Sequence, residues 1–417
     1  MTEWKTYKLG DICDLVAGFA FKSKDFGNYP DKVVKIADIQ PPTVNINDLA
    51  GIDLSAYNPS KLQKFIVSKG DYVLAMTGAT IGKLGRITND IEAYINQRVL
   101  TFRPNESIVD KDYLYYQLCS VNFSKYILNH IDSETAQPNI SAGSVGGFEI
   151  ALPSLEEQRR IAGILGAIDD KIENNRRINT NLELQAQALY KQWFVDFEFP
   201  NKEGKPYKSS GGKMADSELG LIPEGWNAGK LENMGSIVGG GTPSKAIAEY
   251  YTENGIAWIT PKDLSLTHSK FTSKGEIDIT ELGYNNSSTK IMPRGSVLFS
   301  SRAPIGYISI AKNEICTNQG FKSVIPNNGY TAFVYYYLLA NTSNIEAQAT
   351  GSTFKEASGA LMKSLDIVIP NNSLIEEFEG LMSPIFDKQE GLEEENTTLT
   401  TLRDTLLPKL MNGEIKM

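Results

Sequence analysis

The sequence is poor in the side chains that most often carry chemistry or bind metal ions. Its 417 residues include three cysteines and two histidines. Cys13, Cys119 and Cys316 lie far apart and form no CxxC pair, which favours free thiols in a reducing cytosol over disulfides or a zinc site. His130 and His268 have no Cys or Asp at the spacing of a metal site or a catalytic triad. We therefore expect no catalytic residue and no bound metal.

Long apolar runs are also absent. No stretch approaches the roughly 18 consecutive apolar residues of a membrane-spanning helix. The N-terminus, "MTEWKTYKLGDICDL", has no basic segment followed by an apolar run, which argues against a secretory signal. We therefore expect a cytoplasmic protein that does not contact a membrane.

A net positive charge is missing as well, because 50 acidic residues outnumber 41 basic ones and leave a net charge of −9. The acidity is uneven. Residues 371–417 contain 4 basic and 10 acidic side chains, whereas residues 1–150 contain 15 and 17 and residues 201–370 contain 16 and 15. The two large segments are thus close to neutral, and a neutral domain can still present a basic face to DNA.

The chain repeats itself after about 222 residues. The matches include Trp4 with Trp226, Leu9 with Leu231, Gly18 with Gly240, Gly70 with Gly295, Gly82 with Gly306, and Asn96-Gln97 with Asn318-Gln319. Several matches in the same order at nearly one offset indicate an internal duplication. Within each half, short apolar runs such as "DYVLAM" and "SVLFSS" are separated by Gly, Asn, Asp and Pro, which predicts a mixed sheet with many loops.

Each half ends in a long segment whose seam positions alternate three and four residues apart. In the first segment they are Ile161, Leu165, Ile168, Ile172, Asn175, Asn179, Leu182, Ala186, Leu189 and Trp193. In the second they are Leu374, Phe378, Leu381, Ile385, Lys388, Leu392, Glu395, Leu399, Leu402 and Leu406. A single stripe of this kind is as often packed on its own domain. Two of equal length predict a coiled coil, with polar residues at its centre.

These features predict an α+β fold: two similar mixed α/β domains separated by two long helices that pair as an antiparallel coiled coil, with a pseudo-two-fold internal repeat. Ser154 and Glu157 form a capping box that begins the first helix, and Pro408 and Gly413 end the second. The expected segments are a first domain at 1–151, a helical spacer at 152–198, a linker at 199–225, a second domain at 226–370 and a second helical spacer at 371–417.

Several stretches, taken together and in order, carry a resemblance to a known family. They are "LVAGFAFKSKDF" (15–26), "GDYVLAMTGATIGKLG" (70–85), "NQRVL" (96–100), "LPSLEEQRRIAGILGAID" (152–169), "LYKQWFVDFEFP" (189–200), "IPEGW" (222–226), "GGGTPS" (239–244), "WITPKDL" (258–264) and "LRDTLLPKLMNGEI" (402–415). On these residues, and over nearly its whole length, the chain resembles the DNA-specificity (S) subunit of type I restriction–modification systems.

The resemblance implies that both globular domains are target-recognition domains, each recognising one half of a bipartite site in double-stranded DNA. It also implies a subunit that does no chemistry and binds no cofactor itself. The implied partners are two adenine-N6 methyltransferase subunits that use S-adenosylmethionine and, in the complete enzyme, two ATP-driven restriction subunits. "GFAF" in the first half and "GGGTPS" in the second differ, as two domains with different half-sites should.

Basic and polar side chains in the expected loops are our candidates for contacting DNA. Lysines between the aromatics of "FKSKDF" (21–26), and cations after the glycines of "GATIGKLG" (78–85), suit phosphate contacts, although a solvated charged turn is the alternative for the first stretch. Gln97 and Arg98 suit bidentate contacts to adenine and guanine, but the recurrence of Asn-Gln fits a shared structural role equally well. The candidates are Lys22, Lys24, Lys83, Arg86, Gln97, Arg98, Thr242, Ser244, Lys245, Lys262, Arg302 and Lys322.

Motifs of the catalytic subunits are incomplete in this chain. "GATIGKLG" has three residues between its glycines instead of four, and Leu84 stands where a phosphate-binding loop has Ser or Thr, so a glycine-rich hairpin is expected. "QPPT" (40–43) lacks both the acid or amide and the aromatic of an adenine-methyltransferase motif. Two rival functions are a coiled-coil scaffold that binds only protein and a small-molecule enzyme with a duplicated sheet. The second would need paired titratable groups, which the sequence does not show.

Overall fold

The computed structural model describes residues 4–131, 138–267, 269–302, 304–351 and 355–415, so His268 lies outside the described residues. The chain divides into two compact units. The first unit consists of Met1–Glu173 with Thr397–Met417, and the second consists of Asn174–Asn396. Each unit therefore contains one globular domain together with part of both long helices.

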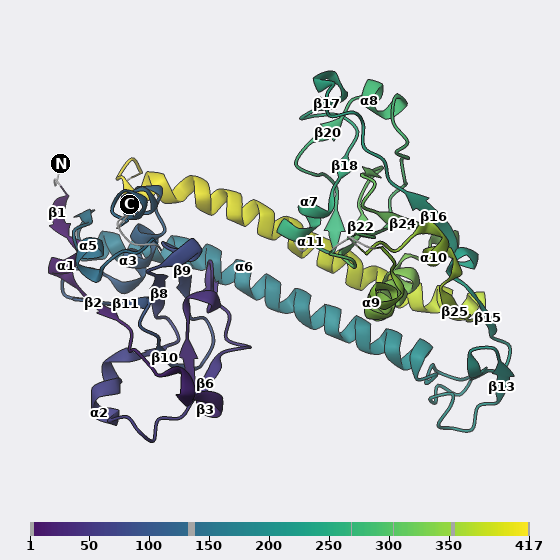
Figure 1. The fold of residues 1–417 in the computed structure, drawn as a ribbon, viewed down its shortest axis with the longest axis horizontal. Coiled ribbons are helices and arrows are strands. Elements are labelled where there is room, and N and C mark those ends of the chain that lie inside the picture. Colours follow the sequence, from purple (N-terminus) through teal and green to yellow (C-terminus); the bar gives the residue numbers. More distant parts are fainter. Residues whose placement is uncertain (1–3, 132–137, 268, 303, 352–354, 416–417) are drawn as a thin grey trace. The chain divides into compact units, whose positions relative to one another are not determined.

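The first domain is built on a six-stranded mixed sheet in the order β2-β11-β8-β9-β5-β4. These strands are β2 (Cys13–Ala17), β11 (Val99–Pro104), β8 (Tyr72–Ala75), β9 (Leu84–Arg86), β5 (Thr43–Val44) and β4 (Ile39–Gln40). Strand β8 is buried along its whole length, because its run Tyr-Val-Leu-Ala is apolar on both faces. Figure 1 shows this sheet beside the short helix α3.

Smaller elements complete the first domain. A second sheet has the order β6-β3-β10-β7 and contains β6 (Ala50–Ile52), β3 (Phe26–Val34), β10 (Glu92–Ile95) and β7 (Ile66–Ser68). Strand β1 (Lys5–Lys8) pairs antiparallel with β12 (Glu149–Leu152). The helices are α1 (Leu9–Ile12), α2 (Pro59–Leu62), α3 (Lys111–Leu118), α4 (Val121–Asn129) and α5 (Ala142–Gly146). Helix α3 begins where the Asp110 carboxylate accepts the N–H groups of Asp112 and Tyr113.

The second domain has a five-stranded sheet in the order β16-β24-β21-β22-β19. These strands are β16 (Gly235–Gly239), β24 (Lys322–Pro326), β21 (Val297–Phe299), β22 (Ile308–Ala311) and β19 (Phe271–Thr272). The paired short strands are β15 (Asn227–Lys230) with β25 (Asp366–Ile369), β17 (Tyr251–Thr252) with β20 (Asp278–Ile279), and β18 (Trp258–Ile259) with β23 (Cys316–Thr317). The helices are α7 (Pro261–Thr267), α8 (Glu281–Asn285), α9 (Thr331–Gln348) and α10 (Gly359–Ser364).

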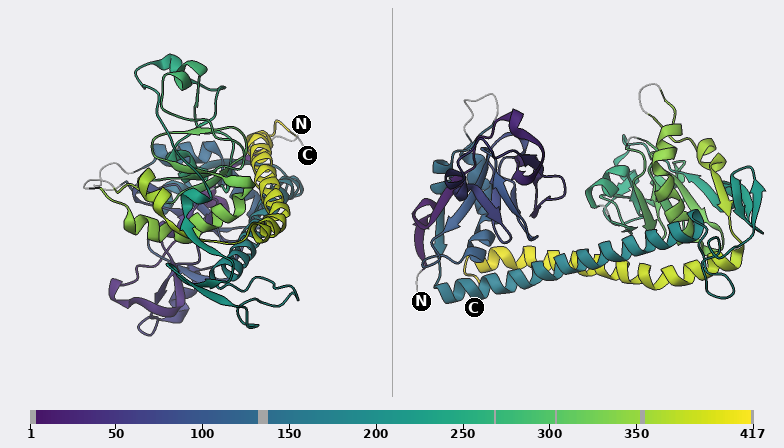
Figure 2. Two further views of the ribbon diagram at one scale, coloured as in Figure 1. Left: turned by 90° about the vertical axis from the view of Figure 1, so that its right-hand side faces the viewer. Right: turned by 90° about the horizontal axis from the view of Figure 1, so that it is seen from below.

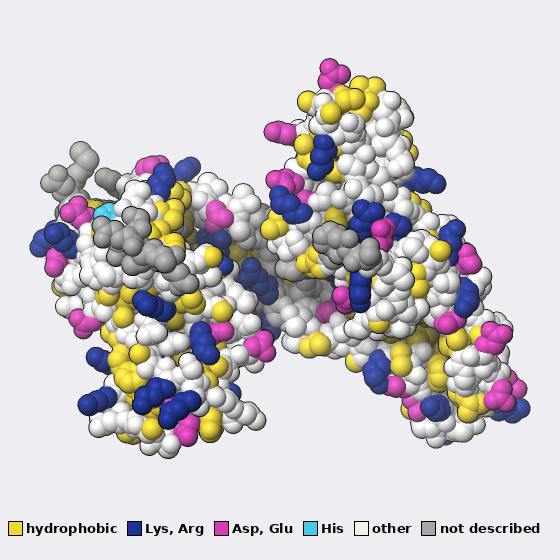
Figure 3. Space-filling model, viewed as in Figure 1, with side chains coloured by type: hydrophobic (Ala, Val, Ile, Leu, Met, Phe, Trp, Pro, Cys, Tyr) yellow, Lys and Arg dark blue, Asp and Glu magenta, His cyan; other side chains and the backbone are white. Residues whose placement is uncertain are grey.

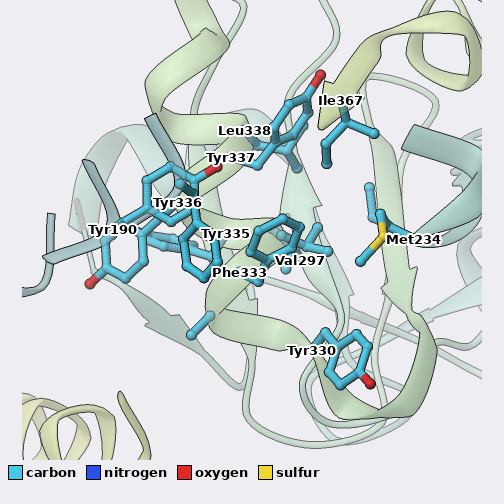
Figure 4. Close-up of a cluster of buried hydrophobic side chains, with 14 of the residues drawn as sticks. Tyr190, Met234, Val297, Tyr330, Phe333, Tyr335, Tyr336, Tyr337, Leu338 and Ile367 are labelled. Atoms are coloured by element: carbon cyan, nitrogen blue, oxygen red, sulfur yellow. The ribbon is translucent and has the colours of Figure 1, made fainter. Parts of the chain in front are cut away.

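The core of the second unit is unusually aromatic. Helix α9 buries Tyr330, at its cap, and the run from Phe333 to Tyr337, and these rings pack against Val297 of the sheet (Figure 4). The predicted linker, residues 199–225, contributes to the same core, because Phe199 stacks on Trp226 with ring centroids 5.0 Å apart. That segment also contains a hairpin of β13 (Met214–Ser217) and β14 (Gly220–Pro223). It is thus folded structure attached to the second domain.

The duplication is preserved in the pairing register of the two sheets. In the first sheet Leu15 pairs with Phe102 and Ala17 with Leu100. The corresponding pairs in the second sheet, 222 residues later, are Ile237 with Val324 and Gly239 with Lys322. In the first sheet the pairs β11–β8 and β8–β9 are antiparallel and the pair β9–β5 is parallel. In the second sheet the pairs β24–β21 and β21–β22 are antiparallel and the pair β22–β19 is parallel. Five strands of each domain therefore form the same arrangement, which we call the shared sheet.

The backbone conformation explains why two of the repeated residues are glycines. Gly70 and Gly295 both have φ of 86°, and each donates its N–H to a distant backbone carbonyl, that of Ile87 at 2.8 Å and that of Ala311 at 2.9 Å respectively. Residues with a side chain seldom adopt this left-handed conformation, whereas glycine does so freely. The same tight turn therefore precedes β8 and β21.

The two long helices are α6 (Leu155–Tyr190), which continues into a π-helical turn at Lys191–Val195, and α11 (Asn372–Met411). In the first unit Asp169 of α6 pairs with Arg403 of α11 at 2.9 Å. In the second unit the rings of Tyr190 and Phe378 lie 6.1 Å apart. Within each unit, early residues of one helix thus lie beside late residues of the other, so the two helices pair antiparallel there, as the right view of Figure 2 shows for each unit.

Polar residues lie in the middle of this pair, within the second unit. Asn175 is fully buried and donates to the Glu395 carboxylate at 2.8 Å and to the Asn396 amide oxygen at 3.0 Å. Asn179 donates to Glu393 at 3.5 Å. At the start of α6, the Ser154 hydroxyl accepts the Glu157 N–H at 3.2 Å, so Ser154 caps the helix as predicted.

The predicted seam of α11 is wrong at three positions. Leu381 and Leu402 are 45% and 46% exposed, and Lys388 is also exposed, whereas Met382 and Gln389 are buried. An α-helix has 3.6 residues per turn, so a straight heptad stripe drifts by about 20° per heptad. Because α11 contacts both α6 and its own domain, its buried face follows the neighbouring positions instead. The other predicted seam residues of both helices are buried or half-buried: Ile161, Leu165, Ile168, Ile172, Asn175, Asn179, Leu182, Ala186, Leu189, Trp193, Leu374, Phe378, Ile385, Leu392, Glu395, Leu399 and Leu406.

Candidate nucleic-acid interface

A clamped turn carries Lys22 and Lys24 in the first domain. The 3₁₀ turn Ser23–Asp25 is held by Tyr57, whose hydroxyl donates to the Asp25 carboxylate at 2.5 Å and accepts the Lys22 backbone N–H at 3.1 Å. Both lysine side chains are exposed, and neither ammonium group pairs with a carboxylate in the part of the chain that the structure describes. The turn therefore offers two positive charges on a fixed backbone.

A cluster of aromatic rings that includes Tyr57 lies next to this turn. Phe19, Phe21 and Tyr57 contact one another with ring centroids 5.0 to 5.6 Å apart. The Lys35 ammonium lies 3.9 Å above the ring of Phe26. Figure 3 shows Lys and Arg side chains among apolar ones over the end of the first unit that carries α2 and β3. A basic surface with aromatic support suits contact with a polyanion.

Two of the predicted cations, Lys83 and Arg86, follow the glycine-rich turn after β8, and their surroundings differ. Lys83 is exposed, and no described side chain pairs with its ammonium group. Arg86 is half-buried, forms an ion pair with Asp112, and has its guanidinium 5.2 Å from the centroid of the Tyr115 ring. Lys83 is free to contact a phosphate, whereas Arg86 is already engaged within the domain.

The repeated Asn-Gln dipeptide has a structural asparagine and an exposed glutamine. The Asn96 side-chain oxygen accepts the Gln97 N–H at 2.9 Å, and Asn318 accepts the Gly320 N–H at 2.8 Å. Gln97 and Arg98 are exposed. Arg98 aligns with Gly320 in the second domain, so this cation belongs to the first domain alone.

The repeated glycine beside this turn is required by close packing. A Cβ on Gly18 would lie 2.2 Å from the backbone oxygen of Asn96, and one on Gly240 would lie 1.9 Å from that of Asn318. No side chain can be accommodated at these distances. The match of Gly18 with Gly240 thus reflects one backbone contact that occurs twice.

In the second domain most candidates are engaged by neighbours. Thr242 donates to Gln319, and Lys262 pairs with Glu276 at 2.5 Å. Arg302 and Lys322 both pair with one carboxylate, that of Glu356. Ser244 and Lys245 are exposed, without a polar partner for their side chains among the described residues.

Groups suited to catalysis are not assembled in the described part of the chain. Burial raises the pKa of the Cys13 and Cys316 thiols to about 12, which makes both poor nucleophiles. His130 stacks on Tyr126 and bonds its carbonyl at 2.9 Å. No three His, Cys, Asp or Glu of the described residues come together as metal ligands, and none of the described helices combines the length and apolar character needed to cross a membrane.

Comparison with known proteins identifies the family. The model described as "Type I restriction modification DNA specificity domain" matches residues 1–184 and 223–377, which together are most of the chain. The chain belongs to this family of DNA specificity subunits. The match confirms the family resemblance, and its two segments correspond to the two mixed α/β domains with the long helix α6 between them.

Individual proteins that are similar to this chain are also specificity subunits of type I restriction systems. The HindI specificity subunit of Haemophilus influenzae is 27% identical and aligns over the whole of both chains. The MjaIX specificity subunit of Methanocaldococcus jannaschii is 37% identical over 190 residues, covering 45% of this chain and 44% of that one. The crystal structure of the type I S subunit from M. genitalium matches with a TM-score of 0.62 at 15% identity, covering 98% and 96% of the two chains. The predicted assignment as a non-catalytic specificity subunit is confirmed.

Sequence reasoning missed two residues that hold the candidate cations. Tyr57 donates a hydrogen bond to Asp25, 32 residues earlier in the sequence, and Glu356 accepts one from Arg302, 54 residues earlier. The signal for Tyr57 was the aromatic composition of its surroundings, whereas the counterpart of Glu356 in the first half is Asn139, so the repeat gave no indication of a carboxylate there. Such partners become visible only when the strands and loops have been placed.

Proposed function

We propose that this specificity subunit recognises a bipartite site in double-stranded DNA, with one half-site for each domain. The observation that carries the proposal is the shared sheet, which occurs twice in the chain and whose first two strands have the same pairing register at an offset of 222 residues. Two copies of one framework with different loops suit two half-sites of different sequence. A single continuous site would not require a duplicated framework.

The candidate contacts divide into two kinds. Lys22, Lys24, Lys83 and Lys245 are exposed cations that suit phosphate contacts, which supply affinity and make binding salt-dependent. Gln97 and Arg98 are exposed beside a turn that Asn96 fixes, so they suit contacts to base edges, each worth about 1–3 kcal/mol of discrimination. Arg86 and Lys262 are weaker candidates, because carboxylates already neutralise them.

The long helices are proposed to set the distance between the half-sites. Helix α6 has 36 residues and α11 has 40, so at about 1.5 Å per residue each extends about 54 to 60 Å. The antiparallel pairing within each unit gives the two domains equivalent attachments, since each is followed directly by its own long helix. Residues 152–198 and 371–417 are thus the proposed spacers between domains at 1–151 and 226–370.

The catalysts are proposed to be partner subunits. They would be two adenine-N6 methyltransferases that use S-adenosylmethionine and, in the complete enzyme, two ATP-driven restriction subunits. This proposal is supported by the family of the chain and by the lack of an assembled catalytic group among the described residues. The chain itself would select the site at which they act.

The decisive experiment is co-expression with an adenine methyltransferase subunit, followed by sequencing that maps every methylated adenine. We expect one bipartite motif with a fixed gap. Lys22→Gln with Lys24→Gln should lower methylation of that motif, while the matched pair Lys202→Gln with Lys213→Gln, two exposed lysines of the segment 199–225, should not. A protein scaffold without a DNA role would instead give no motif and no effect of either pair.

A further inference from the structure

Glu356 joins two cations of the second domain through separate oxygens. Its Oε2 accepts from Arg302 Nε at 3.0 Å, and its Oε1 accepts from Lys322 Nζ at 3.1 Å. The Arg302 side chain is 47% exposed, Glu356 is 32% exposed and Lys322 is 18% exposed. Burial raises the Glu356 pKa, but the bonds from Lys322 and Arg302 outweigh it and hold that pKa below its usual value. The group is therefore an ionised carboxylate, at the surface, with both oxygens occupied.

The first domain has the same backbone at this place but no charges. Ile140 donates its N–H to the Met76 carbonyl at 2.9 Å, and Ala357 donates to Ser301 at 2.8 Å. Beside this bond Thr77, one residue after Met76, bridges Asn139, just as Arg302, one residue after Ser301, bridges Glu356. One residue later, Ser141 and Ser358 each cap a short helix with their hydroxyl. The framework is thus the same whether the facing pair is Thr and Asn or Arg and Glu.

Because the neutral pair supports the same framework, the charged group is not required to fold it. A partly exposed ion pair also contributes little to stability. Its effect on a polyanion is larger, since each phosphate that a cation neutralises adds about 0.9 to the salt dependence of binding. A carboxylate that pairs with two cations keeps them from phosphates and so lowers the salt dependence of DNA binding.

We propose that Glu356 is a specificity-determining residue of the second domain, which withholds Arg302 and Lys322 from the phosphates of non-target DNA. This inference rests on the proposed function. On the correct half-site, a base amino group in the major groove, at cytosine N4 or adenine N6, donates to the carboxylate and releases a cation to its own DNA partner. A phosphate cannot take that place, because it is negatively charged and has no proton to donate at neutral pH.

The test compares Glu356→Gln with wild type, each as full-length chain in complex with its methyltransferase subunits. Binding is measured from 50 to 300 mM salt on a 40-bp duplex that lacks the methylated motif and on one that contains it. We expect the plot of log affinity against log salt on the non-target duplex to steepen by about 0.9 if one cation is released, and by about 1.8 if both are. Discrimination between the duplexes should fall, and the mapped motif should become degenerate in the second domain's half alone.

The matched control is Asp366→Asn, which removes the same charge from an exposed pair with Lys230 on β15 and β25. Glu356→Gln should change the slope more than this control does. In a background of Arg302→Gln with Lys322→Gln, Glu356→Gln should no longer steepen the slope. Thermal melting of each complex verifies folding.

The outcomes separate this inference from the proposed function. If wild type methylates a bipartite motif but Glu356→Gln alters neither slope nor half-site beyond the Asp366→Asn control, Glu356 is structural and the inference is wrong. A slope that steepens equally without Arg302 and Lys322 would also overturn it. If wild type methylates no bipartite motif at all, the proposed function itself fails.

Discussion

Lys270 is a buried ammonium group in the second unit, with a side chain only 7% exposed. Its Nζ donates to Glu183 of α6 at 2.7 Å, to the Tyr336 hydroxyl at 2.8 Å and to Gln389 of α11 at 3.0 Å. The ring of Phe386 lies 3.9 Å away. Burial lowers the pKa of Lys270 from 10.5 to about 8, although Glu183 opposes the shift. We predict that Glu183→Gln destabilises the protein in a manner that depends on pH.

The magnitude follows from that pKa. Removing one partner of a buried ion pair commonly costs about 3–5 kcal/mol. Here the variant can avoid part of this cost by releasing the Lys270 proton. Because pH 7 is one unit below the Lys270 pKa of about 8, releasing that proton costs about 1.4 kcal/mol. A weakened hydrogen bond adds about 1 kcal/mol. The expected loss of unfolding free energy at pH 7 is therefore about 2–3 kcal/mol.

The sign of the pH dependence is also fixed. The folded pKa of Lys270 lies below the unfolded value, so the unfolded chain binds more protons between about pH 8 and 10.5. In wild type above pH 8, Lys270 is largely neutral and no longer needs Glu183 as a counter-charge. The charge part of the penalty should vanish by pH 9.5 and grow by up to about 1.4 kcal/mol for each pH unit below 8.

Urea unfolding of wild type and Glu183→Gln at pH 6.5, 8 and 9.5 measures this difference. Glu156→Gln serves as the control, because Glu156 forms an exposed pair with Arg160 on the same helix and should show no comparable trend. A Glu183→Gln penalty that is constant across the three pH values, or one that increases with pH, would refute the assignment of Lys270 as a buried cation stabilised by Glu183.

Three further predictions concern the spacer, the shared sheet and the first unit. Deleting one heptad from both long helices, about 10 Å, should shorten the gap between methylated half-sites by about 3 bp, and an unchanged gap would exclude the spacer role. Gly240→Ala should lower the melting temperature, because the new Cβ meets a backbone oxygen at 1.9 Å, whereas Gly239→Ala, with its nearest atom at 3.9 Å, should be tolerated. Asp169→Asn should cost about 1–3 kcal/mol in urea unfolding, since Asp169 accepts from both Arg403 and Tyr116, and a loss no larger than that of Glu156→Gln would contradict this.

The parts of the fold that were predictable are those governed by local rules or by the repeat. The stripe of α6 follows from its spacing, and Ser154 begins the helix because its hydroxyl satisfies a free N–H group. The duplication was visible since glycines at left-handed turns and close contacts cannot be replaced, as Gly70 and Gly240 show. Such positions keep their identity where the surrounding side chains change.

The parts that were not predictable depend on contacts between distant segments. The seam of α11 shifts to Met382 and Gln389 because that helix faces its own domain as well as α6. The engagement of Arg86 by Asp112, and of Arg302 by Glu356, depends on loops whose course a pattern of residue types does not give. The structure was therefore needed to tell the free candidate cations from the paired ones, since both look alike in the sequence.

The same polar attachment recurs in both units, and it explains how the loops can vary. Tyr116 lies five residues after the start of α3 and donates to Asp169 at 2.8 Å, and Tyr336 lies five residues after the start of α9 and donates to Glu183 at 3.2 Å. Both carboxylates belong to α6. Each domain is thus fixed to α6 through the helix that carries its tyrosine, α3 or α9, and none of the candidate DNA contacts takes part in these two hydrogen bonds. Loop side chains such as Arg98 or Glu356 can change without altering how a domain is held, so recognition and attachment are separable within each unit.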